Sequence, residues 1–334
     1  FLDHGGGFRS RGLRLGYRHC RLGRGGSRGQ RSYRRFGAFE VTICFVAGLL
    51  AFLLWPSEAL AWGPVTHIVH GSSVLADLTS LSPALQTILS ANSDRYLYGC
   101  IGADIIQAKI YTKSVDSHCH RWPIAWKFVS TARSDGEKAF AWGYLTHLAA
   151  DIVSHNHFVP TQLLRSFDRR TMGHAYWEAR ADAAQRQSHW RMVRSVLKGE
   201  YRDCDELVGE VVEHTLFSFK TNKRIFDSLM AVHKFDRWNA FIKTVNRRSR
   251  LLLSRHAVDR YNDACVRSVL DLLVKEQASF TQNCDPTGQE VLRRAIGLRR
   301  RMRMLKRRKR LPAGMERELA RRYLPDLDEV SAFG

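Results

Sequence analysis

The sequence predicts an all-α protein, a single multi-helix bundle-like domain with a cluster of metal ions in its core. Three observations lead to this prediction. Apolar residues recur at helical spacing in several stretches, and no alternating apolar and polar segment is bounded by hairpin turns. Histidines and carboxylates lie four residues apart inside weakly charged, apolar stretches. A chain of 334 residues is also long enough to bury a sizeable core.

The metal prediction rests on two pairs of residues in one short part of the chain. His147, Asp151 and His155 follow at intervals of four, so on a helix they project from one face. His174 and Glu178 repeat this spacing on a second helix. One such pair is usually a surface or capping interaction, but these pairs lie among apolar residues, where unpartnered polar groups are costly. A divalent cation would offset that cost, and helices that each bring a His and a carboxylate inward form a known bundle-core metal arrangement.

The charge of the chain is strongly positive but unevenly distributed. Lys and Arg number 53 against 32 Asp and Glu, a formal net charge of +21. Ten arginines lie in residues 1–40, and eleven Lys and Arg with no acidic residue lie in residues 293–310. The middle of the chain is closer to balance, so the charge alone does not indicate nucleic-acid binding.

The cysteine pattern argues against a cysteine zinc ribbon, because none of the seven cysteines shows C-x-x-C spacing. Five of them follow residue 61, and an odd number rules out complete pairing within that part of the chain.

The N-terminal segments are predicted to lie outside the folded domain. Residues 1–40 are rich in Gly and Arg, and we expect a disordered basic arm; RNA binding is the alternative. Residues 41–61 fit a signal peptide, because their apolar run is short for a membrane span and ends at an A-x-A cleavage site. Cleavage would make Trp62 the new N-terminus of an exported protein. An uncleaved anchor is the alternative.

The first elements of the domain are predicted to be short helices. Thr66 is a candidate N-cap of a helix that carries His67 and His70. Residues 83–89 form a second helix, with Ser82 as its N-cap and a proline at its first position.

A long apolar helix is predicted from Glu137 to His155. Before it, Asp104 stands in a nearly uncharged context, where an isolated Asp is most often a cap or turn residue. His118 and His120 lie on a predicted loop. Later helical stretches are expected at about 190–200, 205–219, 222–232, 235–254 and 257–280. The chain contains no Walker loop and no G-x-G-x-x-G fingerprint.

The C-terminal segment, residues 291–334, is predicted to be a basic tail. Its apolar residues form no clean helical stripe by this interpretation, so a solvated charged tail is one expectation. The other is attraction to an anionic membrane surface, where each basic residue contributes roughly 1 kcal/mol. Nucleic-acid phosphate is a further potential partner.

Taken together, the segments from Trp62 to Asp182 resemble the zinc-dependent phospholipase C family. The same superfamily includes the zinc-dependent single-strand nucleases of fungi and plants. The resemblance implies that residues 62–290 form an α-helical domain that binds up to three Zn²⁺ ions. In that family the mature N-terminal Trp is itself a ligand, through its amine and carbonyl, so export and cleavage would complete the site.

The resemblance also implies a ligand set. It comprises Trp62, His67, Asp104, His118, His147, Asp151, His174 and Glu178. Within it, Asp151 would bridge two metals, and His174 and Glu178 would share another. The family places a histidine six residues after the bridging Asp, which is His157, whereas helical geometry favours His155, and both stay open. His70 and His120 are reserves for His67 and His118.

The implied chemistry is hydrolysis of a phosphodiester. Clustered zinc ions can deprotonate a water and stabilise the charge that develops at phosphorus. Asp104 would also orient the water or act as general base. The expected substrate is a phospholipid, cleaved between glycerol and phosphate. Alternatives are an exported single-strand nuclease on the same scaffold, suggested by the position of His67 five residues after Trp62, and a zinc-stabilised membrane-surface binding protein without turnover. Glu178 favours the phospholipase, because the nucleases more often have Asp there.

Overall fold

The computed structural model describes residues 63–106, 119–170, 172–212, 219–224, 226, 253–312 and 314–323. These residues form helices and turns without a strand, which confirms the predicted all-α class. All of them belong to one structural unit, Ala51–Gly334. The predicted arm, the predicted signal peptide, Trp62 and His118 lie outside the described residues. Among the helices that are described, none combines the length and apolarity needed to cross a bilayer.

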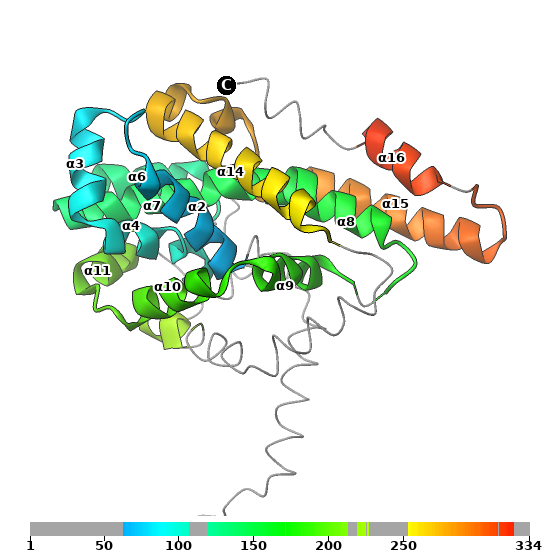
Figure 1. The fold of residues 1–334 in the computed structure, drawn as a ribbon, viewed down its shortest axis with the longest axis horizontal. Helices are drawn as coiled ribbons and strands as arrows, with labels where there is room; N and C mark the ends of the chain where they lie inside the picture. Colours follow the sequence, from blue (N-terminus) through cyan, green and yellow to red (C-terminus); the bar gives the residue numbers. More distant parts are fainter. Residues whose placement is uncertain are drawn as a thin grey trace, which may run out of the picture. The chain divides into compact units, whose positions relative to one another are not determined.

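Helix α7 (Asp135–Val153) is the central element of the fold. Almost all of its side chains are buried, so an apolar helix of this length needs neighbours on every side. Helices α4 (Ser93–Gly99), α6 (Trp122–Thr131) and α14 (Arg255–Lys275) pack around it, as Figure 1 shows. A capping box between Ser134 and Glu137 fixes its first turn.

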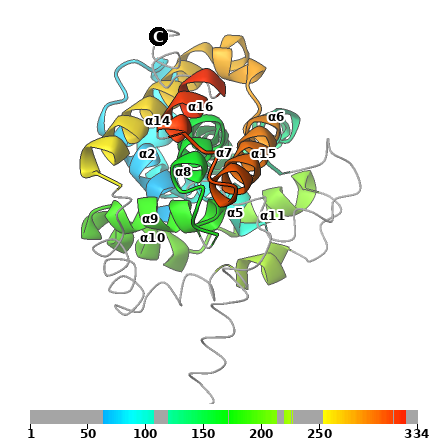
Figure 2. The same ribbon diagram turned by 90° about the vertical axis from the view of Figure 1, so that its right-hand side faces the viewer.

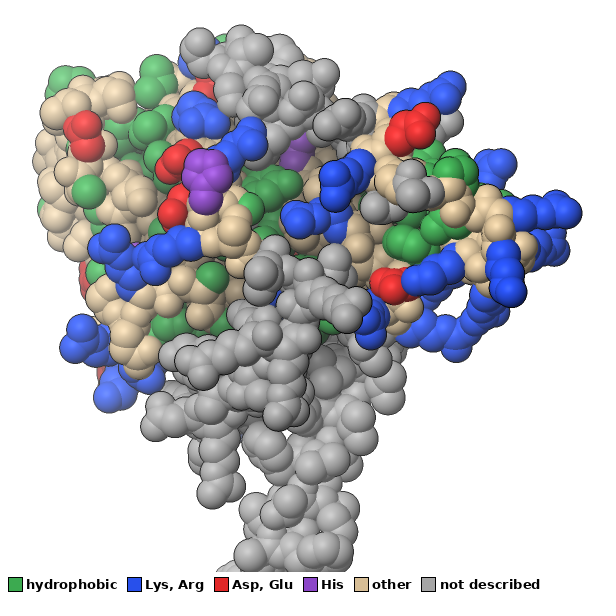
Figure 3. Space-filling model, turned by 45° about the vertical axis from the view of Figure 1, so that its right-hand side comes forward, with side chains coloured by type: hydrophobic (Ala, Val, Ile, Leu, Met, Phe, Trp, Pro, Cys, Tyr) green, Lys and Arg blue, Asp and Glu red, His purple; other side chains and the backbone are tan. Residues whose placement is uncertain are grey.

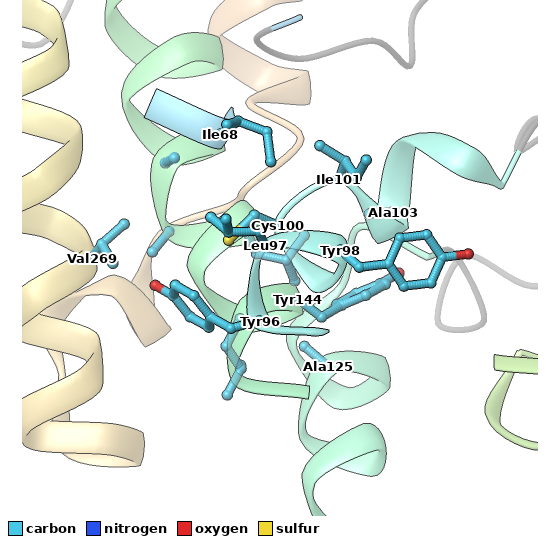
Figure 4. Close-up of a cluster of buried hydrophobic side chains, with 14 of the residues drawn as sticks. Ile68, Tyr96, Leu97, Tyr98, Cys100, Ile101, Ala103, Ala125, Tyr144 and Val269 are labelled. Atoms are coloured by element: carbon cyan, nitrogen blue, oxygen red, sulfur yellow. The ribbon is translucent and has the colours of Figure 1, made fainter. Parts of the chain in front are cut away.

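The crossing of α4 and α7 depends on glycine. A Cβ atom added to Gly143 would lie 2.0 Å from the carbonyl oxygen of Tyr96, so the two backbones are in direct contact. The Tyr96 hydroxyl hydrogen-bonds to the Thr146 hydroxyl at 2.9 Å across the same crossing. Figure 4 shows Tyr96, Cys100 and Tyr144 in the buried cluster around this contact. The crossing therefore holds the middle of α7 in place against the chain that leads to Asp104.

Helix α2 (Pro64–Ala76) begins earlier than predicted. Gly63 is its N-cap and Pro64 occupies the first turn, so Thr66 lies inside the helix and the predicted Thr66 cap is wrong. Asp182 takes over this role from helix α9 (His174–Ala184): its carboxylate accepts hydrogen bonds from the Thr66 N–H at 2.9 Å and hydroxyl at 2.7 Å. A side chain distant in sequence thus satisfies the free N–H groups of the first turn.

Helix α3 (Pro83–Ala91) follows the prediction, since the Ser82 hydroxyl accepts from the backbone N–H of Leu85. It packs against α7, and α4 follows it directly.

The long helix predicted from Glu137 to His155 does not continue as a regular α-helix to its end. It becomes a π-helix, η3 (Ser154–Phe158), and then α8 (Val159–Arg165). Pro160 has no N–H to donate to a carbonyl of the preceding turn, which accounts for the irregular hydrogen bonding. His155 therefore leaves the face that carries His147 and Asp151, and the predicted single stripe of three residues is wrong at its third member.

Helix α5 (Gly102–Ile105) is a short element for which no helix was predicted. Helices α10 (Gln187–Lys198) and α11 (Arg202–Val211) differ from their predicted ranges mainly at their ends. Helix α14 begins and ends a few residues before the predicted 257–280. Its end at Lys275 coincides with the positive φ of 51° at Glu276, and the Ser254 side chain caps its start. Most of 213–252, where two further helices are predicted, lies outside the described residues. The five cysteines within the described part of the chain form no disulfide with one another.

The C-terminal run predicted as a basic tail forms an ordered helix in its first part. Helix α15 (Gln289–Arg307) packs on α8, and so does α16 (Met315–Tyr323), as Figure 2 shows. Its buried side chains are Leu292, Ala295, Arg299 and Met302. The sequence interpretation overlooked this stripe because an arginine lies within it. That guanidinium is buried against α8 and donates to backbone carbonyls of Arg169 and Met172.

Candidate metal centre

The first ligand group consists of His67, Asp104, His120, His147 and Asp151, all buried. Asp151 lies at its middle. One carboxylate oxygen lies 3.3 Å from His67 Nε2, and the other lies 3.2 Å from His147 Nε2 and 3.4 Å from His120 Nε2. The rings of His67 and His147 stack with their centroids 3.8 Å apart. Four separate segments, α2, α5, the 119–121 turn and α7, thus bring their side chains to one carboxylate.

Asp104 approaches the same point from α5. One of its oxygens lies 3.9 Å from His120 Nε2 and 4.0 Å from His147 Nε2, and the other lies 4.0 Å from His67 Nε2. These distances exceed hydrogen bonds but leave room for an ion that several of these atoms would share. An isolated Asp in an apolar context, expected from the sequence to be a cap or turn residue in most cases, here faces three histidines.

The second ligand group consists of His155, His174 and Glu178. His174 Nε2 and Glu178 Oε1 lie 2.5 Å apart on successive turns of α9. The His155 ring from η3 stands edge-on to the His174 ring, with centroids 5.1 Å apart. The π-helical turn thus redirects His155 from the stripe on α7 towards α9.

Backbone carbonyls orient two of the histidines. His147 Nδ1 lies 2.9 Å from the carbonyl oxygen of Cys100, and His155 Nδ1 lies 2.5 Å from that of Pro286. In each contact the ring N–H donates to the carbonyl, which leaves Nε2 as the nitrogen that can bind a metal. In His147 that nitrogen points at Asp151.

The loop that holds His155 comes from the C-terminal part of the chain. Trp122 Nε1 donates to the carbonyl of Cys284 at 2.9 Å, and Asn156 Nδ2 donates to that of Asp285 at 3.0 Å. Gly288, the N-cap of α15, has a φ of 54°, and an added Cβ would lie 2.5 Å from the His155 Cβ. Only glycine fits this backbone conformation at such close range.

The electrostatics of the first ligand group depend on burial and on mutual contacts. Burial lowers the pKa of His67, and the nearby His147 adds to that effect. Burial alone would also lower the pKa of His147, but the carboxylates of Asp151 and Asp104 outweigh it and raise the pKa. Burial would raise the pKa of Asp151, yet His147 and His67 hold it well below its ordinary value. An ionised Asp151 and a neutral His67 are the kinds of donor that Zn²⁺ prefers, and a bound cation would take the place of the proton that the carboxylates favour on His147.

Several buried polar atoms have a metal ion as their natural partner. Within the described part of the chain, both ring nitrogens of His67, both oxygens of Asp151 and Nε2 of His174 lack a hydrogen-bond partner. Buried polar atoms are normally satisfied, so a cluster of exceptions needs an explanation. Burial, with His155 nearby, also lowers the pKa of His174 well below its ordinary value, so its ring is neutral. The residues present therefore fit zinc.

Most of the predicted ligands come together in these two groups. The structure brings together His67, Asp104, His147 and Asp151 in one and His155, His174 and Glu178 in the other. Between the two open alternatives, it places His155 and not His157 with α9, while His157 is buried outside both groups. His120, held as a reserve, lies in the first group. His70 instead hydrogen-bonds to Asn262 through Nε2 at 3.1 Å.

The sequence interpretation missed the groups that support these ligands. The carbonyls of Cys100 and Pro286 are backbone atoms and leave no side-chain signal. Asp182, which holds the helix of His67, is separated from Thr66 by 116 residues. The Gly288 in an Asp-Pro-Thr-Gly turn was the one available signal, because that composition favours a left-handed residue.

A helical core with buried groups of imidazoles and carboxylates from six segments defines a protein that binds several metal ions. The chain belongs to the zinc dependent phospholipase C family, whose model matches residues 66–250, more than half of the chain. Both ligand groups lie within the matched range, and the Pro286 to Gly288 loop lies after it. Zinc is therefore the cofactor, and the two groups could hold several ions. A search of curated proteins gave no match, and neither did a search of solved structures.

Proposed function

We propose that the protein is a phospholipase C that hydrolyses the bond between glycerol and phosphate in a phospholipid. The observation that carries the proposal is that both groups of potential zinc ligands are formed by largely buried side chains in a member of this family. Bound zinc would supply an activated water and charge to stabilise the phosphoryl oxygens. The chain's own side chains would hold the zinc ions and orient the attacking water.

Asp151 and Asp104 have different roles in the first ligand group under this proposal. Asp151 is fully buried, ionised and surrounded by three imidazoles, so it would serve as a ligand that holds the bound zinc. Asp104 is also buried, but its oxygens stay 3.9 to 4.0 Å from the same rings. A carboxylate in that position can accept the proton of the attacking water at Oδ1 and act as general base.

The role of Asp104 can be separated from metal binding by the Asp104→Asn variant. Its amide keeps an oxygen that can ligate but cannot take a proton, so we expect turnover to fall by roughly a hundredfold or more while zinc stays bound. Zinc content and initial rates measured on the same preparation provide the test. Loss of zinc in step with turnover would show that Asp104 serves only as a ligand.

The substrate class rests on the family and on the residues of the second ligand group. The family's description names phospholipase C, and Glu178 occupies a position where the related nucleases more often have Asp. Parallel assays of short-chain phosphatidylcholine in solution and of single-stranded DNA test the assignment. We expect hydrolysis of the lipid, with release of phosphocholine. Cleavage of DNA alone would identify a nuclease on the same scaffold, and zinc content without hydrolysis of either would identify a binding protein.

We further propose that the protein is exported and cleaved after Ala61. Trp62 would then begin the mature chain next to Gly63, the N-cap of the helix that carries His67. Its α-amine, with an ordinary pKa near 8, would be available as a zinc ligand. N-terminal sequencing of the exported protein tests this proposal. A mature chain that retains residues 41–61 would instead favour an uncleaved anchor.

A further inference from the structure

Arginine side chains gather on one side of α15 and on the loop after α8. Arg170, Arg300, Arg303, Met304, Arg307 and Arg308 line a shallow hollow of about 380 Å³, and we call these residues the arginine surface. Lys and Arg side chains are concentrated at the right of Figure 3, the side on which Figure 1 draws α15. No carboxylate lines the hollow.

The arginines of this surface repel one another. Arg170, Arg300, Arg303, Arg307 and Arg308 form no ion pair with a carboxylate among the described residues. Burial lowers the pKa of Arg303, and the charges of Arg170 and Arg300 lower it further. Like charges held together in this way are relieved by an anion. The nearest acidic side chain of the same loop, Asp168, already pairs with Lys306 at 3.0 Å.

Exposed apolar side chains lie among these arginines. Ile296 is 36% exposed and Met304 is 45% exposed, and they are two of the three large apolar side chains exposed in the described part of the chain. Ile296, Arg300, Arg303, Met304 and Arg307 recur at helical spacing, so they share one face of α15. Basic residues interspersed with apolar ones on a helix face are typical of helices that lie in a membrane interface.

We propose that this face of α15 docks the protein on membranes that contain anionic phospholipids. The charge favours lipid phosphates, and the exposed Ile296 and Met304 favour insertion between headgroups, which a nucleic-acid backbone would not require. A second copy of the chain would present the same positive charge and would be repelled. The proposal extends the proposed function, because a phospholipase must reach its substrate at a bilayer surface.

Helix α15 connects the docking face to the metal centre through its packing contacts. The opposite side of α15 packs on α8 and touches η3, which carries His155. The buried Arg299 donates to the carbonyl oxygens of Arg169 and Met172 in the segment that leads to His174. A bilayer bound on the exposed face of α15 would therefore be separated from η3, which carries His155, by this one helix.

Vesicle sedimentation with the full zinc-loaded chain tests the proposal. The vesicles contain phosphatidylcholine alone or phosphatidylcholine with roughly one third phosphatidylserine, and we expect binding only to the anionic ones. In the R300Q/R303Q/R307Q variant, the partition coefficient should fall by roughly a hundredfold, since each basic residue near the surface contributes about fivefold. The matched control is R186Q/R191Q/R202Q, which removes the same charge from α10, α11 and the residue before α10.

Further variants separate the contributions of charge and apolar contact. The R300K/R303K/R307K variant retains the charge and should bind like the natural protein, whereas Met304→Ser, which leaves the charge unchanged, should weaken binding. Equal binding by the natural chain and the Gln variant, or an equal loss in the control, would overturn the proposal. So would binding of single-stranded DNA that is lost in the Gln variant while vesicle binding is unchanged.

Hydrolysis of short-chain phosphatidylcholine in solution makes the two proposals distinguishable. This reaction needs no surface, so the Gln variant should retain it at the natural rate. Vesicle binding without any hydrolysis would contradict the proposed phospholipase activity and support the docking proposal. Hydrolysis without selective vesicle binding would support the phospholipase activity and contradict the docking proposal.

Discussion

Asp151 is the residue on which the first ligand group depends. Three imidazole nitrogens lie within 3.4 Å of its two oxygens, and its side chain is fully buried. The pattern of intervals of four predicted this residue and His147 correctly as neighbours. It could not predict which segment would face them, because that depends on how α2, α5 and α7 pack.

The Asp151→Asn variant should lose zinc and turnover together. Removing the negative charge from a buried site that holds divalent cations costs more than removing a surface charge. Metal analysis and initial rates on the purified variant check this, with Asp203→Asn as the control, since Asp203 pairs with Arg95 at the surface. Full zinc content and full turnover in Asp151→Asn would defeat the assignment.

Gly288 tests the support of His155 from outside the range that matches the family. The Gly288→Ala variant adds a Cβ 2.5 Å from the His155 Cβ at a φ of 54°, so we expect the ring to shift and zinc at the second group to bind more weakly. A titration with a competing chelator should show one class of zinc weakened by roughly ten- to a hundredfold.

The control for this variant lies on the same helix. An added Cβ at Gly297 meets nothing within 4 Å, so Gly297→Ala should leave every zinc affinity unchanged and stabilise the helix by about 0.5–1 kcal/mol. Equal zinc affinities in the two variants would show that the Pro286 to Gly288 loop does not support zinc binding at the second ligand group.

At the scale of elements, the crossing of α4 and α7 positions the first ligand group. The two helices can approach closely because Gly143 has no side chain, which lets the carbonyl of Tyr96 contact the α7 backbone. The helices themselves follow from apolar spacing and from caps such as Ser134, and the sequence predicts them well. The π-helical turn at Ser154–Phe158 is harder to predict, because it results from a proline beyond the helix and from contacts with a distant loop.

The Gly143→Ala variant should separate these helices. An added Cβ would lie 2.0 Å from a backbone oxygen, which cannot rotate away, so we expect a loss of about 3 kcal/mol in the free energy of unfolding. Gly209→Ala on α11 is the matched control, because its added Cβ meets nothing within 4 Å. Denaturant titrations that give both variants the stability of the natural chain would contradict the close crossing.

At the scale of the whole molecule, the fold is a set of helices that surrounds polar groups a dry core would not tolerate. The sequence predicted the all-α class and most of the residues that lie together in the two ligand groups, because periodicity and residue type are local properties. It did not predict the packed helix α15 or the role of Asp182, because both depend on contacts across more than a hundred residues.

Removal of zinc should destabilise the entire domain. Without ions, Asp151, His67 and His174 keep buried atoms that lack hydrogen-bond partners among the described residues. A ligand present at about a thousand times its Kd contributes about 4 kcal/mol, so chelation should lower the Tm by roughly 10 °C. Thermal unfolding with and without chelator measures this. Added Zn²⁺ should restore the Tm and Mg²⁺ should not, because nitrogen ligands disfavour magnesium.

The most direct measurement is a crystal structure of the purified protein with anomalous diffraction recorded on both sides of the zinc absorption edge. The account predicts anomalous peaks within ligand distance of Asp151 and His147, and a further peak between His155, His174 and Glu178. A map without zinc peaks at these residues, or with zinc bound only at the molecular surface, would contradict it.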